Sequence, residues 1–273
     1  KFGFNGKSIV PIITGFGCTV PAIMATRTIA DKKERILTIL TIPFVSCSAR
    51  LPIYVIFISI FFDSYRAVIM LGIYLLGIVV TLLSAKLFSL SFFKGSGSKF
   101  LLEVPPYRMP QLRTITYQSL EKAKRFVKKA GTFILVGSIL LWLLSNNGFG
   151  GINVDPAQSF LGDFAGFISP IFAPLGFGTW EATSSLISGF LAKEVVVSSL
   201  QILYQGDIAA GFTTLSALTY IIFASLYVPC ISTVATIKAE TQSNKWTLFG
   251  VVYPFVVAYL VALVFNLLFG LFL

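Results

Sequence analysis

Three cysteines are the most reactive side chains of this sequence, which contains no histidine. Cys18, Cys47 and Cys230 lie in apolar segments that also contain proline, in the stretches GFGCTVPAIMATR, PFVSCSARLP and YVPC. An odd number of widely separated cysteines does not indicate a disulfide framework. An intramembrane thiol oxidoreductase would need a closely spaced pair, so that class is disfavoured. The thiols are better suited to act as soft ligands for a borderline transition-metal dication.

Backbone oxygens are expected to complete the donor set. A proline cannot donate a hydrogen bond to the carbonyl four residues before it. If the local backbone is helical, the prolines near the cysteines release the carbonyls of Gly17, Ser48 and Ser225. Sulfur and oxygen donors together favour a transition metal over Mg²⁺ or Ca²⁺. If these donors line a path along which a metal ion is transported, the other residues expected along it are Gly15, Gly17, Pro21, Ser46, Ser48 and Pro229.

Charged residues inside the apolar segments are the other candidates for function. A carboxylate such as Glu194, in the stretch LAKEVVVSS, is costly within a membrane and is therefore a candidate cation ligand or proton carrier. The alternative is a structural or interfacial pair between Lys193 and Glu194. Arg50, in SCSAR, leaves a similar choice between a role in the site and an interfacial arginine. The predicted metal-site residues are Cys18, Cys47, Cys230 and Glu194.

The composition places these residues in a membrane protein. The chain has 273 residues, of which 56% are hydrophobic and only 12% are charged. Residues 212–237 and 246–273 carry no charge, and each run exceeds the roughly 20 residues needed to cross the hydrocarbon layer. Backbone exposed to lipid must satisfy its own hydrogen bonds, so the expected elements are helices in a lipid bilayer. The long apolar runs lack the alternation typical of barrel strands.

The distribution of charge indicates how the chain is oriented. The net charge is +10, and residues 94–129 contain nine Lys and Arg, whereas residues 130–192 contain none. The positive-inside rule therefore places the basic linker in the cytoplasm and the loop at 146–180 outside. No recognition motif accompanies the basic residues, so nucleic acid is not expected as a partner.

Short internal repeats divide the chain into two similar halves. TGF and FVSC in the first half match SGF and YVPC in the second half, in the same order. The turns at 26–35 and 238–245 are basic, whereas those at 62–66 and 204–211 are not. This inverted pattern is typical of two repeats related by an axis in the membrane plane. It requires residues 7–30 and 182–203 to be re-entrant hairpins, and the alternative is two kinked spans.

The sequence resembles the transmembrane part of the ferrous iron transporter B (FeoB) family over about residues 6–250. The stretches that carry the resemblance are GFGCTVPAIMATRTI, PFVSCSARLPIYV, LEVPPYRMP, GFLAKEVVVSSL and YVPCISTVATI. The resemblance implies Fe²⁺ uptake across a bacterial cytoplasmic (inner) membrane by a multi-pass protein. It also implies paired gate repeats similar to those of concentrative nucleoside transporters. The cysteines proposed along the family's iron path map onto Cys18, Cys47 and Cys230, and the glutamate of its AKE motif maps onto Glu194.

The predicted fold is therefore an all-α polytopic membrane protein with two inverted gate repeats built from broken or re-entrant helices. The expected divisions are a first repeat at 1–93 with a hairpin-like segment and two spans, a basic cytoplasmic linker at 94–130 with an interfacial helix at its end, a span and external loop at 131–181, and a second repeat at 182–273.

The sequence departs from the family because the cytosolic GTP-binding domain has no counterpart in it. We therefore expect no enzyme activity from this chain, and a cytosolic GTPase domain or subunit outside it as a partner. The family also makes a homotrimer a candidate assembly. Fe²⁺ is expected as the transported substrate, with no permanently bound cofactor. The alternative is a nucleoside-type transporter with the same gate architecture, which is disfavoured because the hairpin tips carry Cys, Gly and Thr.

Overall fold

A computed structural model describes residues 6–91, 109, 111–148, 151–152 and 154–270. Most of the basic linker, including almost all of LEVPPYRMP, lies outside the described residues. The described chain is helical apart from one two-stranded hairpin, in which β1 (Asn147–Gly148) pairs antiparallel with β2 (Gly151–Ile152). The predicted all-α fold is therefore confirmed.

The first half contains two pairs of short helices and one long helix. These are α1 (Ile9–Gly15), α2 (Thr19–Ala25), α3 (Lys32–Thr41), α4 (Leu51–Phe61) and α5 (Arg66–Ser91). Short 3₁₀ turns lie at Gly6–Ser8, Thr26–Thr28, Ile42–Phe44 and Ser48–Arg50. Helix α3 begins at Lys32 because the Asp31 carboxylate accepts hydrogen bonds from the backbone N–H groups of Lys33 and Glu34, at 2.7 and 3.2 Å.

The second half repeats this order after a connecting region. That region contains α6 (Leu112–Asn146), α7 (Phe160–Ile168) and 3₁₀ segments at Pro156–Gln158 and Ser169–Leu175. The repeat itself consists of α8 (Trp180–Leu191), α9 (Val195–Leu203), a 3₁₀ turn at Ile208–Gly211, α10 (Thr214–Leu226), α11 (Ile231–Thr241) and α12 (Asn244–Gly270). Helix α10 begins with a capping box between Thr213 and Ser216.

Within the described residues, four stretches are long and apolar enough to cross a membrane, and a fifth arises if one bent pair counts as a span. The four are Lys32–Phe61, Arg66–Ser91, Thr214–Thr241 and Asn244–Gly270, and the bent pair, Phe160–Leu175 with Trp180–Leu191, turns by 104°. The chain is thus a multi-pass membrane protein, as predicted.

The breaks between the short helices are the central feature of the fold. We number them in chain order: break 1 at 16–18, break 2 at 42–50, break 3 at 192–194 and break 4 at 227–230. Breaks 1 and 3 lie inside the short hairpins α1–α2 and α8–α9, whereas breaks 2 and 4 interrupt the spans α3–α4 and α10–α11. Each half therefore contains a broken hairpin, a broken span and a long helix, in that order.

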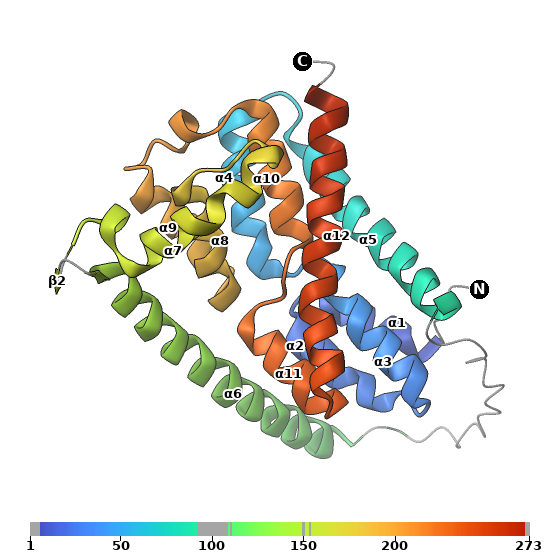
Figure 1. Cartoon of the computed structure of the whole chain (residues 1–273). Helices are drawn as coiled ribbons and strands as arrows, with labels where there is room; N and C mark the ends of the chain where they lie inside the picture. The colour runs from blue at the N-terminus through green and yellow to red at the C-terminus, as the bar shows by residue number, and fades with distance from the viewer. Residues whose placement is uncertain (1–5, 92–108, 110, 149–150, 153, 271–273) are drawn as a thin grey trace.

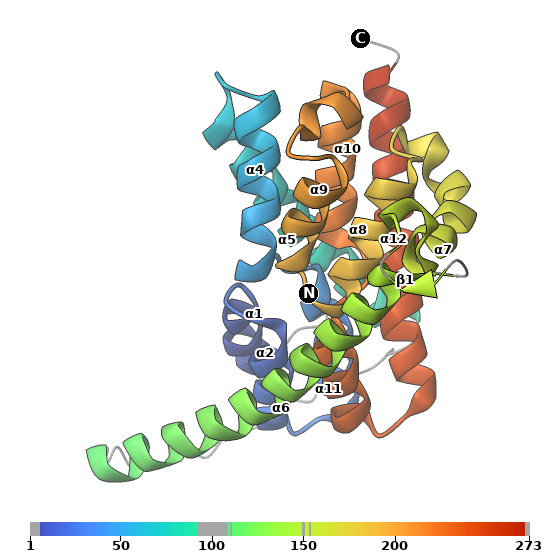
Figure 2. The same cartoon turned by 90° about the vertical axis from the view of Figure 1, so that its left-hand side faces the viewer.

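The two halves also exchange contacts reciprocally. Helix α2, the second arm of the first hairpin, packs against α11 of the second half. Helix α9, the second arm of the second hairpin, packs against α4 of the first half. In both views α1, α2 and α11 lie at one end of the molecule, and α4, α9 and α10 lie at the other end (Figures 1 and 2). This arrangement is the one expected for repeats of opposite orientation.

Helix α6 differs from the expectation of an interfacial helix followed by a separate span. It is one continuous helix of 35 residues, about 50 Å long, and it runs obliquely outside the other helices (Figure 2). Its apolar part, Leu135–Asn146, is too short to count as a span. No proline lies within α6, so nothing in its sequence forces a break where the polar part meets the apolar part.

Two equivalent glycines face the broken spans, and at Gly189 the approach leaves no room for a Cβ atom. A Cβ atom on Gly15, at the end of α1, would lie 3.5 Å from Val45 in break 2. A Cβ atom on Gly189, in α8, would overlap the side chains of Val196 and Tyr227, the latter in break 4. Each hairpin thus packs through the glycine of its TGF or SGF motif against the broken span of its own half.

The Gly189→Ala variant is expected to lower the free energy of unfolding by about 1–3 kcal/mol, because the added methyl group must displace packed side chains. Gly72→Ala is the matched control, since nothing lies within 4 Å of the position of its Cβ atom. Denaturation of both variants in detergent measures the difference. Equal stability of the two variants would contradict the close approach at Gly189.

Candidate functional site

Cys18 and Cys230 are the last residues of breaks 1 and 4, whereas Cys47 lies inside break 2. Cys18 precedes α2, Cys47 precedes the Ser48–Arg50 3₁₀ turn and Cys230 precedes α11, and all three have extended backbone. Cys47 is buried, whereas Cys18 and Cys230 are partly exposed. The sequence therefore places one thiol in each of three breaks, directly before the next α-helical or 3₁₀ segment.

The breaks bring these side chains toward one another. Cys18 lies within the range of electrostatic interaction of Cys47, Cys230 and Glu194, so all four breaks contribute to one region. Among the described residues, no three His, Cys, Asp or Glu side chains are close enough together to hold one metal ion. The role of these four residues as metal ligands stays a prediction. In this conformation they line a region without forming a closed coordination shell.

The backbone carbonyls of the first half are not free, contrary to the prediction. The Gly17 carbonyl accepts two hydrogen bonds from Ser48, one from its backbone N–H at 3.2 Å and one from its hydroxyl at 2.7 Å. The Ser48 carbonyl accepts the N–H of Leu51 within the 3₁₀ turn. Pro21 does remove the intrahelical donor of Gly17, but Ser48 replaces it from break 2. Break 1 is thereby tied to break 2.

Break 4 releases different carbonyls from the one that the proline rule predicted. Helix α10 ends at Leu226, so the backbone is no longer helical at Pro229 and the argument for Ser225 does not apply. The carbonyls involved are those of Tyr227 and Val228. Tyr227 accepts a hydrogen bond from Arg50 at 3.5 Å, and Val228 accepts one from Lys193 at 2.8 Å.

Arg50 and Lys193 are thus internal residues. An interfacial position for Arg50 is wrong, because it is only 2% exposed and its guanidinium also donates to the carbonyls of Pro43 and Val45, at 3.2 and 3.4 Å. Lys193 is 3% exposed, and its amine lies 3.2 Å from the centre of the Tyr227 ring. The adjacent Glu194 side chain is exposed and forms none of the described ion pairs.

The remaining residues predicted to line the path have varied surroundings. Ser46 is buried and shares a hydrogen bond of 3.1 Å with the Tyr54 hydroxyl. Pro21 is partly buried within α2, and Pro229 is buried in break 4. Their proximity to a transported ion stays a prediction.

A cavity of about 320 Å³ opens beside break 3, between α6 and the α8–α9 hairpin. Its lining includes the polar side chains of Ser145, Asn146, Ser188, Ser198 and Ser199. Ser188 and Val195, which also line it, flank break 3 on either side. Hydroxyl groups that surround such a space can hold water next to the break.

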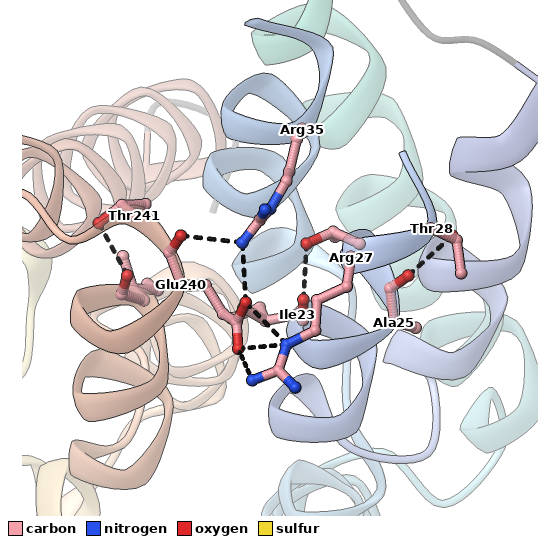
Figure 3. Close-up of polar contacts among 9 residues, drawn as sticks. Ile23, Ala25, Arg27, Thr28, Arg35, Glu240 and Thr241 are labelled. Atoms are coloured by element: carbon pink, nitrogen blue, oxygen red, sulfur yellow. Dashed lines mark hydrogen bonds and ion pairs between the residues drawn. The ribbon is translucent and has the colours of Figure 1, made fainter. Parts of the chain in front are cut away.

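An ion cluster joins the two basic turns at the opposite end of the molecule (Figure 3). The Glu240 carboxylate, at the end of α11, is almost fully buried and accepts hydrogen bonds from Arg27 at 2.6–3.0 Å and from Arg35 at 2.8 Å. Hydrogen bonding to Glu240 raises the pKa of Arg27 above its ordinary value. The turns at 26–35 and 238–245 therefore lie at one end, as the inverted charge pattern predicts.

Comparison with known families identifies this architecture. Residues 1–61 and 127–244 match the family described as "Gate: Nucleoside recognition", and residues 70–122 match "Ferrous iron transport protein B C terminus". The chain belongs to the FeoB family, of which it matches the gate and C-terminal regions. No solved structure matches it.

Curated FeoB relatives are similar over almost the whole chain. The Fe(2+) transporter FeoB of Staphylococcus aureus is 49% identical over 97% of this chain. Those of Methanocaldococcus jannaschii and Campylobacter jejuni are 44% and 42% identical over 98% and 97% of it. The aligned part covers only 41%, 42% and 46% of these relatives, respectively, so the chain spans less than half of their length.

Sequence reasoning missed two sets of polar residues in this FeoB chain. The Glu240 cluster was overlooked because its members were counted only as charges that set the orientation. The carbonyls of Tyr227 and Val228 were overlooked because a proline removes the hydrogen bond to the carbonyl four residues before it, which for Pro229 is that of Ser225. Lys193, an intramembrane charge next to a break, was the signal that could have indicated them.

The Glu240→Gln variant is expected to lower the free energy of unfolding by about 1–3 kcal/mol, because it leaves two arginines beside a buried neutral group. Asp63→Asn is the control, since it removes the exposed Arg66–Asp63 pair and should change stability by less than about 1 kcal/mol. Denaturation of both variants provides the measurement. Equal losses would show that the cluster around Glu240 adds nothing beyond a surface pair.

Proposed function

We propose that this chain is the membrane permease portion of a transporter that moves Fe²⁺ across the bacterial cytoplasmic membrane into the cell. The observation that carries the proposal is the approach of Cys18, Cys47 and Cys230 from three separate helix breaks to one region. The membership of the FeoB family and the names of its curated relatives support Fe²⁺ as the substrate.

The ion would pass the cysteines in sequence. No three-ligand group exists among the described residues, so a single site that traps Fe²⁺ with all three sulfurs does not fit this conformation. Cys18 and Cys230 are partly exposed, whereas Cys47 is buried. This difference favours an order in which the ion contacts Cys47 after one of the partly exposed thiols and before the other. Thiolate sulfur replaces part of the water around the ion at each step.

Glu194 would offset the charge of the approaching ion. Its side chain is exposed at break 3, and it lies within electrostatic range of Cys18. The hydroxyl groups in the lining of the cavity beside break 3 could hold water near this carboxylate. Carboxylate oxygen accepts a hydrated dication more readily than sulfur does, so Glu194 fits an early contact.

The other parts of the proposal concern partners. The relatives are more than twice as long as the aligned region, and we propose that a cytosolic GTPase domain or subunit acts together with this permease. We also propose the homotrimer as its assembly. The basic end that contains the Glu240 cluster faces the cytoplasm in this scheme, in agreement with the positive-inside rule.

A nucleoside-type transporter is the second candidate, because the matching gate family is described by nucleoside recognition. Recognition of a base or ribose requires polar side chains that accept and donate hydrogen bonds at the hairpin tips. The tip of the first hairpin carries Gly17, Cys18 and Thr19. This composition fits a soft metal ion better than a nucleoside.

Replacing each cysteine by serine is expected to reduce Fe²⁺ uptake by about tenfold or more, the scale on which groups around a metal alter its binding. The complete natural polypeptide that contains this chain should be reconstituted in proteoliposomes and tested with Fe²⁺ and with uridine. Met70→Leu is the matched control, because it removes a sulfur from α5, outside all four breaks.

Undiminished Fe²⁺ flux in the variant that lacks all three thiols would contradict the role of the cysteines. Uridine flux without Fe²⁺ flux would favour the nucleoside transporter instead.

A further inference from the structure

Arg50 and Lys193 are an unusual pair of buried basic residues. Their residues are 2% and 3% exposed, and neither takes part in an ion pair among the described residues. A buried charge without an opposite charge is costly unless hydrogen bonds compensate it. Here the compensation comes from backbone carbonyls of breaks 2 and 4.

The two side chains differ in how firmly they are held. Arg50 donates to three carbonyls, two in break 2 and one in break 4, so it clamps the two breaks together. Lys193 makes a single hydrogen bond, to Val228, and rests on the Tyr227 ring. A lysine carries one compact charge on a flexible stem, whereas the arginine fork is planar and fixed by several partners. The Lys193 amine can therefore move away from the Val228 carbonyl while the hydrogen bonds of Arg50 within break 2 remain.

The position that the Lys193 amine occupies is suited to a metal cation. Carbonyl oxygens at broken helices replace the water around transported cations in many transporters and channels. The Val228 carbonyl is two residues before Cys230, and the Lys193 amine lies within electrostatic range of Cys47 and Cys230. A basic group of the protein thus binds one oxygen donor of the proposed path and lies near two of its sulfur donors.

We infer that Lys193 is a tethered amine that competes with the transported divalent ion for the carbonyl of Val228. This inference rests on the proposed function. The amine and a divalent ion cannot occupy this position together, because both bind the same carbonyl oxygen. Lys193 thereby determines how tightly the path binds its ion, and an ion that enters must move the amine aside.

The competition also links ion binding to movement of a hairpin. Lys193 belongs to break 3, and its bond to Val228 is a direct tie between the α8–α9 hairpin and break 4. When the ion displaces the amine, this tie is lost. Occupation of the path therefore loosens the second hairpin from the broken span, while Arg50 keeps breaks 2 and 4 together.

Titration with Co²⁺, followed by thiolate absorption bands, tests the inference in the complete natural polypeptide in detergent. Lys193→Met should bind Co²⁺ about tenfold or more tightly than the unaltered protein, within the usual range of coupling between two binding events. Lys193→Gln, which can still donate to Val228 but has no charge, should lie between them, and Lys193→Arg should not bind more tightly. Lys238→Met is the matched control, because Lys238 is exposed at the end of α11.

Unchanged Co²⁺ binding by both Lys193→Met and Lys193→Gln would overturn the inference. Weaker binding by both variants would also overturn it, because the lysine would then be a ligand or a structural support. The thermal midpoint of each variant shows whether it is folded, and Lys193→Gln carries the test if Lys193→Met is not. Binding that depends on the cysteines but not on Lys193 would leave the proposed function intact. Absence of Co²⁺ binding in every variant would contradict both.

Discussion

A backbone carbonyl that leaves a helix within a membrane must find another donor, because lipid offers none. Four helix breaks in this protein create that demand, and side chains from other breaks meet it. Ser48 binds the Gly17 carbonyl, Arg50 binds the Tyr227 carbonyl and Lys193 binds the Val228 carbonyl. The breaks are therefore not independent defects in four helices. They form one hydrogen-bonded network that holds both halves of the chain in register.

The same network explains why the cysteines approach one another without forming a complete metal site. Each thiol is carried by a residue within a break, so its position follows from the hydrogen bonds that fix that break. The Gly17, Tyr227 and Val228 carbonyls, which could complete a coordination shell, are already bound by the protein. In the proposed function this arrangement corresponds to a closed path, in which an ion would exchange with internal donors one at a time. Such an exchange replaces one set of contacts by another and avoids any stage with bare buried polar groups.

Much of the fold could be predicted because its signals are local. Apolar length fixes the spans, and the glycines and prolines near Cys18 and Cys230 mark the breaks. The contacts that fix the site are not local: Arg50 and Tyr227 are 177 positions apart. The proline rule states only which intrahelical bond is lost, so it identified Gly17 but not Ser48 as the new partner. The burial of Arg50 could not be predicted either, because its hydrogen-bond partners come from two separate segments, breaks 2 and 4.

The two halves share an architecture but not their chemistry, and this asymmetry would give the proposed path a direction. In the first half the hairpin is tied to the broken span by Ser48, whose backbone N–H and short side chain both bind the Gly17 carbonyl. In the second half the corresponding tie is made by the amine of Lys193, on a flexible stem, at the Val228 carbonyl. A flexible side chain can leave its partner while the backbone stays in place, whereas the Ser48 tie cannot be broken without moving the backbone of break 2. An ion that competes for these carbonyls would therefore act mainly on the second hairpin, so that repeats of similar fold respond unequally to the same ion.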